Sequence, residues 1–283
     1  MTLLGAAQIR ELAEAIGLKP AKALGQNFVI DSNVCKKIVR IAGVTSTDIA
    51  LEIGPGLGSL TLALLEEAAS VIAVEIDPRL AQQLPLTAAI HSERADQLTV
   101  INQDALGIST LISDPTVLVA NLPYNVSVPV LLHLLEKVPT LRSGVVMVQA
   151  EVADRLAASP GSKDYGIPSV KSAWWAQVKG AGSVSRSIFW PAPNVDSKLV
   201  SFTRRATPGD EVMRKKVFTI IDAAFAQRRK MLRSALSSLY GSSALAEEIL
   251  TKAGIDPTLR GEALEISGFC AIALASPDNK STK

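Results

Sequence analysis

From Asp48 to Gln149 the chain alternates between short apolar runs and longer stretches with apolar residues at helical spacing. Short continuous apolar runs are typical of parallel strands that are buried on both faces of a sheet. They predict strands at Ile49–Ile53, Val71–Ile76, Leu98–Asn102, Val117–Leu122 and Val145–Gln149. Between several of these strands the pattern predicts helices at Ser59–Glu67, Pro78–Leu84 and Pro129–Lys137. This alternation predicts an α/β domain with a doubly wound, Rossmann-like sheet.

The pattern changes on either side of this region. Before it, a helix is predicted over Ala6–Ile16, and a second should begin near Asp31 or Ser32, which are both good N-cap residues. After a strand-like stretch at Lys198–Thr203, the remaining predicted elements are helices at Glu211–Ala226, Arg229–Leu239, Ala244–Ala253 and Glu262–Ala275. We therefore predict an α/β domain with an N-terminal helical extension at residues 1–205 and a smaller all-helical domain at residues 206–283.

Composition excludes several classes of protein. A hydrophobic fraction of 48% in 283 residues is ample for a packed core and argues against disorder. The longest apolar runs are too short to span a bilayer, and the start of the chain has no basic segment typical of a signal peptide. We therefore expect a cytoplasmic protein with no membrane partner. Two cysteines and two histidines show no ligand spacing, so we expect no metal.

Charge is distributed unevenly. The net charge is only +2, but the segment from Arg204 to Arg260 holds eleven Lys and Arg against six Asp and Glu, which leaves a local charge of +5. A basic C-terminal part on a nearly neutral protein indicates a phosphate-rich partner. The alternative is a solvated helix surface without a ligand.

Glycines and acidic residues follow the predicted strands. Gly54, Gly56 and Gly58 come after the first strand, where glycine lets the backbone turn sharply and approach a ligand closely. Their spacing is not that of a dinucleotide-binding loop, which argues against NAD. Glu75 ends the second strand, about 20 residues past the loop, and suits the hydroxyls of a ribose. Asp104 follows the third strand and suits an adenine amino group or, alternatively, a helix cap.

The segment Asn121-Leu122-Pro123-Tyr124 ends the fourth predicted strand. The Asn121 amide oxygen and the backbone carbonyls around Pro123 can accept hydrogen bonds from an exocyclic amine, and the Tyr124 ring can stack on a base. Alone, the segment is compatible with a simple turn. Because carboxyl ends of parallel strands meet in one crevice, its combination with the upstream loops indicates an S-adenosylmethionine-dependent methyltransferase that acts on an amine of a base.

Five motifs, in order over nearly the full chain, resemble the ribosomal RNA adenine dimethyltransferase family: Lys22–Phe28, Glu52–Gly58, Asn121–Ser127, Glu151–Leu156 and Phe189–Ser197. The resemblance implies a class I methyltransferase fold with S-adenosyl-L-methionine as methyl donor. Within the family, the similarity is greatest to bacterial enzymes that dimethylate N6 of two adjacent adenosines in the 3′-terminal hairpin loop of 16S rRNA. The implied partner is 16S rRNA within the 30S subunit or its precursor, in a step of ribosome biogenesis, and we expect a monomer.

The resemblance also implies roles for individual residues. The cofactor-binding residues by the family pattern are Asn27, Val29, Gly54, Glu75, Asp104 and Asn121. The catalytic residues are Asn121, Leu122, Pro123, Tyr124 and Phe189, with Phe189 as a second aromatic side chain near the target base. For Phe189, core packing beside a Pro-rich turn is an equal alternative. The RNA-binding residues, which resemble the family's basic C-terminal helix, are Arg228, Arg229, Lys230 and Arg233.

Three other functions remain compatible with parts of the pattern. The 23S rRNA adenine methyltransferases of the macrolide-resistance type resemble the first domain, although the Asn-Leu-Pro-Tyr-Asn-x-Ser form and the segment Asp256-Pro257-x-x-Arg260 favour the small-subunit enzymes. A non-catalytic RNA-binding or assembly protein on the same fold is disfavoured by the intact Glu75, Asn121 and glycine loop. A small-molecule methyltransferase would leave the basic C-terminal region without a purpose.

Overall fold

The chain forms two compact units in a computed structural model that describes residues 3–19 and 26–277. The first unit extends to Asp154 and includes Val178–Arg204. The second consists of Arg155–Gln177 and the chain from Arg205 onward. The division at Arg204 lies next to the predicted boundary. Residues 155–177, however, which the sequence placed in the α/β domain, belong to the helical unit.

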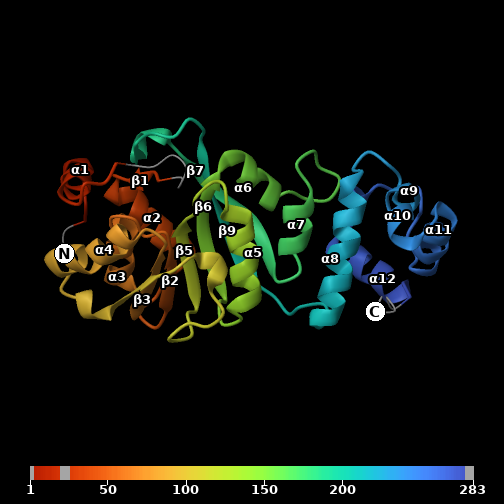
Figure 1. The fold of residues 1–283 in the computed structure, drawn as a ribbon, viewed down its shortest axis with the longest axis horizontal. Coiled ribbons are helices and arrows are strands. Elements are labelled where there is room, and N and C mark those ends of the chain that lie inside the picture. The colour runs from red at the N-terminus through yellow and green to blue at the C-terminus, as the bar shows by residue number, and fades with distance from the viewer. Residues whose placement is uncertain (1–2, 20–25, 278–283) are drawn as a thin grey trace. The chain divides into compact units, whose positions relative to one another are not determined.

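The first unit is built around a seven-stranded sheet with the strand order β4-β3-β2-β5-β6-β9-β7. Figure 1 shows this sheet and labels most of its strands. The strands are β2 Ile49–Ile53, β3 Ser70–Glu75, β4 Leu98–Asn102, β5 Val117–Asn121, β6 Ser143–Gln149, β7 Ala176–Val184 and β9 Ser197–Arg204. The pairs from β4 to β6 are all parallel, and β9 is antiparallel to β6. The predicted α/β class with a Rossmann-like sheet is confirmed, and each of the five predicted strands is present to within two residues at either end.

The helices of the first unit include one with a side-chain cap at its start and one that extends beyond its predicted end. They are α1 Ala6–Ala15, α2 Ser32–Ala42, α3 Ser59–Glu67, α4 Pro78–His91, α5 Ser127–Lys137 and α6 Ala150–Leu156, whose last two residues belong to the second unit. Asp31 caps α2 by accepting hydrogen bonds from the amides of Asn33 and Val34. The prediction that α4 ends at Leu84 was wrong, because Pro85 is tolerated within the helix. The buried residues Thr87 and Ala88 continue its apolar face.

A second, two-stranded sheet joins the N-terminal segment to a distant part of the chain. Strand β1 (Phe28–Val29) pairs antiparallel with β8 (Phe189–Trp190), with Val29 opposite Phe189. The hydroxyl of Ser59, at the start of α3, donates to the Val29 carbonyl at 2.6 Å. These contacts hold Phe28 and Val29 beside the helix that follows the glycine loop. Residues 22–25, the earlier part of the first sequence motif, lie outside the described residues.

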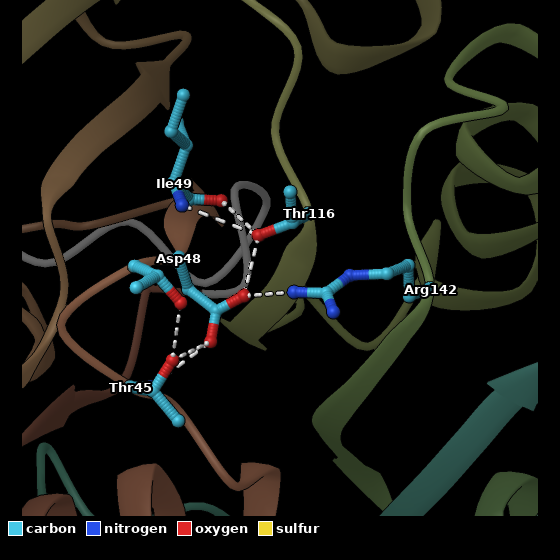
Figure 2. A network of polar contacts seen from close by, with 6 residues as sticks. Thr45, Asp48, Ile49, Thr116 and Arg142 are labelled. Carbon is cyan, nitrogen blue, oxygen red and sulfur yellow. Dashed lines mark hydrogen bonds and ion pairs between the residues drawn. The ribbon is translucent and has the colours of Figure 1, made fainter.

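A polar network joins the starts of two central strands, at the edge of the sheet opposite their carboxyl ends (Figure 2). The Asp48 carboxylate accepts hydrogen bonds from the hydroxyls of Thr116 and Thr45, at 2.6 and 2.8 Å, and pairs with Arg142. Burial opposes ionisation of Asp48, but the hydrogen bonds outweigh it and lower its pKa. The Thr116 hydroxyl also accepts a hydrogen bond from the Ile49 amide, and the Thr116 amide donates to the Ile49 carbonyl. These bonds fix the start of β2 against the start of β5.

The second unit is helical and has its own apolar core. Its helices are α7 Ile167–Ser172, α8 Glu211–Ala226, α9 Leu232–Ala235, α10 Ser237–Tyr240, α11 Ser243–Lys252 and α12 Ile266–Ala275. Val217, Ile221 and Phe269 are completely buried between them. No helix in the described ranges, 3–19 and 26–277, is long and apolar enough to cross a membrane.

The predicted helix at Arg229–Leu239 was wrong. The chain turns at Gln227–Lys230, closed by a 2.8 Å hydrogen bond from the Lys230 amide to the Gln227 carbonyl, and then forms the two short helices α9 and α10. The amides of Leu232 and Arg233 donate to the carbonyls of Leu259 and Pro257 rather than continuing α8. This long-range pairing replaces the local helical hydrogen bonds.

Candidate functional site

A pocket opens at the carboxyl ends of β2, β3, β4 and β5, where the strand order changes direction. Ligands of open α/β sheets bind at such switch points. The pocket is lined by the N-terminal segment, the glycine loop and the strand ends. All six predicted cofactor-binding residues line it: Asn27, Val29, Gly54, Glu75, Asp104 and Asn121. The structure therefore brings together side chains that lie up to 94 positions apart.

The glycine loop depends on its glycines at two positions. Gly54 and Gly56 have φ angles of 69° and 58°, which L side chains rarely adopt. A Cβ atom on Gly56 would lie 2.9 Å from the ring of Phe28, far inside normal contact distance. Phe28 therefore packs directly behind the loop, and the backbone of Gly56 is left open to the pocket.

Glu75 holds this loop in place from the end of β3. One carboxylate oxygen accepts a hydrogen bond from the Gly56 amide at 3.1 Å, and the other accepts one from the Asp77 amide at 3.0 Å. Burial raises the pKa of Glu75, and only 5% of the residue is exposed. Each carboxylate oxygen has a second lone pair, so the group retains the capacity to accept two hydroxyl donors.

The two aspartates near the pocket have separate tasks. Asp77 caps α4 by accepting a hydrogen bond from the Arg79 amide at 3.0 Å. It also accepts a hydrogen bond from the Gln26 side chain at 3.3 Å, which joins the N-terminal segment to the end of β3. Asp104 accepts from the Leu106 amide at 2.9 Å and also lines the pocket. The capping interpretation of Asp104 is confirmed, and a role toward an adenine amine stays a prediction.

Asn121 is oriented by a partner in the N-terminal segment. Its amide nitrogen donates to the Asn27 carbonyl at 3.1 Å. With the nitrogen committed to that bond, the amide oxygen is the group available as an acceptor. The next residue continues the sheet pairing, because the Leu122 amide donates to the Met147 carbonyl at 3.0 Å. Asn121 is thus fixed at the pocket by contacts on both sides.

Tyr124 lies in a turn that follows β5. The Val126 amide donates to the Pro123 carbonyl at 3.2 Å, which closes the turn. The Tyr124 hydroxyl and the hydroxyl of Ser197, which is completely buried, form a 2.7 Å hydrogen bond. Burial raises the pKa of Tyr124. Pro123 lines the pocket, and the next residue, Tyr124, is half-buried. A contact between the Tyr124 ring and a base stays a prediction.

Phe189 is 3% exposed and belongs to the apolar core of the first unit. The core-packing interpretation is therefore confirmed. Phe189 reaches the site indirectly, because its register partner Val29 lines the pocket. A contact with a target base stays a prediction.

The four predicted RNA-binding residues lie in the second unit but not on one helix. Arg228 pairs with Glu262 at 2.8 Å, and Arg233 pairs with Glu247 at 3.1 Å. Arg229 and Lys230 are exposed and make no ion pair with any described residue. Only two of the four cations therefore have their charge fully available to a ligand.

Sequence reasoning assigned no role to Glu52, the first residue of the glycine motif. Glu52 is 1% exposed, lines the pocket with its neighbours, and accepts a 2.6 Å hydrogen bond from the Thr61 hydroxyl. Burial raises its pKa to about 8, and the nearby charge of Glu75 adds to the effect. A carboxylate inside an otherwise apolar strand was the available signal.

Glu52→Gln is expected to flatten the pH dependence of stability. A carboxyl with a folded pKa of about 8 and an ordinary value of 4.5 stabilises the fold below that ordinary value, and loses this contribution as pH rises toward 8. The slope is about 1.4 kcal/mol per pH unit while the folded and unfolded states differ by one proton. Urea unfolding at the two ends of this range measures it. Glu67→Gln, on the exposed end of α3, should keep the wild-type slope; an equal slope in Glu52→Gln would show that Glu52 is ionised throughout.

A metal site is not evident in the ranges 3–19 and 26–277, where no three His, Cys, Asp or Glu side chains gather in a way that could hold an ion.

The parallel sheet, the glycine loop and the acidic strand ends define a class I methyltransferase domain, joined in this chain to a helical unit. The chain belongs to the ribosomal RNA adenine dimethylase family, whose sequence model matches residues 17–275. It is 60% identical over 275 residues to the ribosomal RNA small subunit methyltransferase A of Leifsonia xyli subsp. xyli, covering 96% of this chain and 98% of that protein. It is 58% identical to the protein of the same name from Streptomyces avermitilis, covering 96% and 93%.

Solved structures agree with this assignment. A dimethyladenosine transferase from Plasmodium falciparum superposes with a TM-score of 0.74 at 25% identity, covering 87% of this chain and 96% of that chain. The 23S rRNA methyltransferase ErmE superposes with a TM-score of 0.65 at 24% identity, covering 88% and 99%. The latter likeness shows the shared fold alone.

Proposed function

We propose that this chain is an S-adenosylmethionine-dependent enzyme of ribosome biogenesis that dimethylates N6 of two adjacent adenosines in the 3′-terminal hairpin loop of 16S rRNA. The observation that carries the proposal is the likeness, over nearly the whole of both chains, to small-subunit rRNA methyltransferases at 54–60% identity. The substrate is the 30S subunit or its precursor. We expect the enzyme to act as a monomer in the cytoplasm, where that substrate is assembled.

The pocket fits the proposed cofactor. Glu75 would accept hydrogen bonds from the ribose hydroxyls and Asp104 one from the adenine amine, while the backbone at Gly54, Asn27 and Val29 would surround the rest. Gly56 and Phe28 both line the pocket, and because a Cβ atom on Gly56 would lie 2.9 Å from the Phe28 ring, only glycine lets the loop pack this closely at the pocket wall. When bound, the cofactor supplies a methyl group on a sulfonium, which is already a good leaving group.

Positioning of the amine is then the main task of the protein. The bond from the Asn121 amide nitrogen to the Asn27 carbonyl orients the amide group, and its oxygen would accept a hydrogen bond from N6. The amine's lone pair is delocalised into the adenine ring, and holding the N–H groups favours a lone pair that points at the methyl. Tyr124, anchored through Ser197, would stack the adenine after it leaves its loop.

Methyl transfer to purified unmethylated 30S particles, 50S particles and free adenosine tests the proposed function. Transfer to 30S particles alone, with two methyl groups on each of two adenosines, is the expected result. Transfer to 50S particles would assign the chain to the 23S rRNA methyltransferases, and transfer to adenosine would make it a small-molecule enzyme. No transfer to any of them would favour a non-catalytic assembly protein.

Tyr124→Phe is expected to retain much of the methyl-transfer rate, whereas Tyr124→Ala is not. Phenylalanine keeps the ring that stacks on the base, a contact worth about 1–3 kcal/mol, and loses only the hydrogen bond to Ser197. Single-turnover transfer to 30S particles at saturating enzyme distinguishes the two. Ser197→Ala is the matched control for the lost hydrogen bond. Equal losses in the Phe and Ala variants would mean that the hydroxyl, not the ring, is required.

Replacing Arg229 and Lys230 together with alanine is expected to weaken 30S binding and to reduce its dependence on salt. Each phosphate contact that is lost lowers the slope of log affinity against log salt by about one. Binding to 30S particles over a series of salt concentrations gives the slope, and Lys215→Ala on α8 serves as a control for net charge. A slope identical to that of the wild type would show that the two charges are only solvated surface.

A further inference from the structure

A polar loop at Ser159–Gly166 is held tightly on the helical unit. The Gly161 amide donates to the Glu262 carbonyl at 2.7 Å, and the Tyr165 hydroxyl donates to the Leu264 carbonyl at 2.8 Å. Tyr165 is 4% exposed and packs against Phe225 of α8, with ring centroids 6.3 Å apart. The loop is thus pinned at two points to the segment before α12, although about a hundred residues separate the two in sequence.

Arg228 provides the third attachment. Its guanidinium donates to the Lys163 carbonyl at 2.6 Å and to the Ser162 carbonyl at 3.4 Å, and it pairs with the Glu262 carboxylate at 2.8 Å. Most of the donors of Arg228 are therefore used within the protein. This geometry suits a residue that positions the loop. The direct phosphate contact by Arg228 that the sequence predicted stays a prediction.

The attachment by Arg228 places Lys163 beside the turn at Gln227–Lys230, called here the basic turn. Lys163 is exposed and makes no ion pair with any residue in the described ranges. Its own carbonyl is bonded to Arg228, the residue directly before the exposed cations Arg229 and Lys230. Asp164 is the one acid next to Lys163 in the loop, and it is also exposed. This bond therefore brings the exposed Lys163 into the neighbourhood of the exposed Arg229 and Lys230, although the two segments are distant in sequence.

We propose that Lys163 is a further contact to rRNA phosphates, and that Arg228 and Glu262 position it beside Arg229 and Lys230. This inference rests on the proposed function, and it extends the RNA-binding surface to a segment that precedes the predicted domain boundary. Phosphates are the chemistry that such a surface recognises, because clustered lysine and arginine side chains that lack acidic partners release counterions when they meet a nucleic-acid backbone.

Lys163→Ala tests the contact directly. Lys163 helps to hold the loop only through its backbone carbonyl, which alanine keeps. Thermal unfolding and S-adenosylmethionine affinity should therefore stay unchanged in Lys163→Ala. Affinity for unmethylated 30S subunits should show a salt slope lower by about one, so that the advantage of the wild type shrinks about threefold between 50 and 200 mM salt. Lys252→Ala on α11, an exposed cation of the same unit, is the matched control and should keep the wild-type slope. A wild-type slope in Lys163→Ala overturns the proposal.

Coupling between Lys163 and Arg228 tests the positioning role. Arg228→Ala should weaken 30S binding in the wild-type background. The effect should be much smaller in the Lys163→Ala background, because the loop then has no lysine side chain to position against the RNA. Equal effects in both backgrounds would show that Arg228 contacts RNA by itself, and would overturn its positioning role.

The variant Arg229→Ala/Lys230→Ala distinguishes a failure of the Lys163 contact from a failure of the proposed function. If that variant loses affinity and Lys163→Ala does not, the proposed function stands and the inference fails. If wild-type enzyme methylates no 30S particle, the proposed function itself fails.

Discussion

Asn121→Ala is expected to lower single-turnover methyl transfer to 30S particles by about 10²-fold or more, the scale of losing one well-placed polar group at a reacting centre. The Asn121 amide nitrogen is already bonded to the Asn27 carbonyl, so its oxygen is aimed by the fold before any substrate arrives. Its interaction is best formed when N6 is in line with the donor methyl, and such interactions raise rate rather than affinity. Binding of the 30S particle should stay within about threefold of the wild type, because phosphates supply most of the affinity.

Two further variants separate chemistry from structure at this position. Asn121→Asp keeps the acceptor and loses the donor to Asn27, so it should retain more of the rate than alanine while weakening cofactor affinity. Asn33→Ala removes an exposed amide at the start of α2 and should change neither property. The measurement is the rate at saturating enzyme and cofactor. A wild-type rate in Asn121→Ala would reduce the Asn-Leu-Pro-Tyr segment to a simple turn, and the catalytic interpretation would fail with it.

The central strands could be predicted from sequence because of where they lie. β2 and β5 are covered on both faces, so their sequences are nearly continuous apolar runs, and each was located to within one residue. Because the carboxyl ends of β2, β3, β4 and β5 meet at one edge of the sheet, the sequence predicted that Gly54, Glu75, Asp104 and Asn121 lie in one pocket. That part of the site follows from a topological rule that parallel sheets obey.

Other parts of the structure have no local signal. The two-residue strands β1 and β8 pair across about 160 positions, and neither has a pattern long enough to read. Residues 155–177 join the helical unit through contacts such as Tyr165 with Leu264, which no property of the segment itself indicates. The prediction of a helix at Arg229–Leu239 was wrong for the same reason, because the amides of Leu232 and Arg233 donate to carbonyls far along the chain.

The roles within the site divide in a similar way. The residue types and their strand-end positions could be predicted, but the hydrogen bonds that orient them could not. The bond from Asn121 to Asn27 and the use of Arg228 as a loop anchor depend on pairs separated by more than 60 residues. Charge alone made the four basic residues equivalent, whereas the structure separates two ion-paired arginines from two exposed cations.

Glu75→Ala is expected to weaken S-adenosylmethionine binding by about 10- to 100-fold, which corresponds to about 1–3 kcal/mol for charge-assisted hydrogen bonds that lose their acceptor. Two causes contribute. The ribose hydroxyls would lose the carboxylate, and the amides of Gly56 and Asp77 would lose the oxygens that fix the glycine loop. Glu75→Gln keeps one accepting oxygen and should have an intermediate affinity. Calorimetric titration measures the loss, with Glu67→Ala on the exposed end of α3 as the unchanged control.

A ligand without the 2′-hydroxyl separates these two causes. If Glu75 binds the ribose, the wild type should lose affinity for 2′-deoxy-S-adenosylhomocysteine relative to S-adenosylhomocysteine, and Glu75→Ala should discriminate little between them. The carboxylate and the hydroxyl would then be coupled as a direct pair. If Glu75→Ala discriminates as strongly as the wild type, its weakened binding comes from the loosened glycine loop and the ribose contact is excluded. Unchanged affinity for both ligands would remove Glu75 from the cofactor site altogether, although its two backbone partners would still give it a structural role at the end of β3.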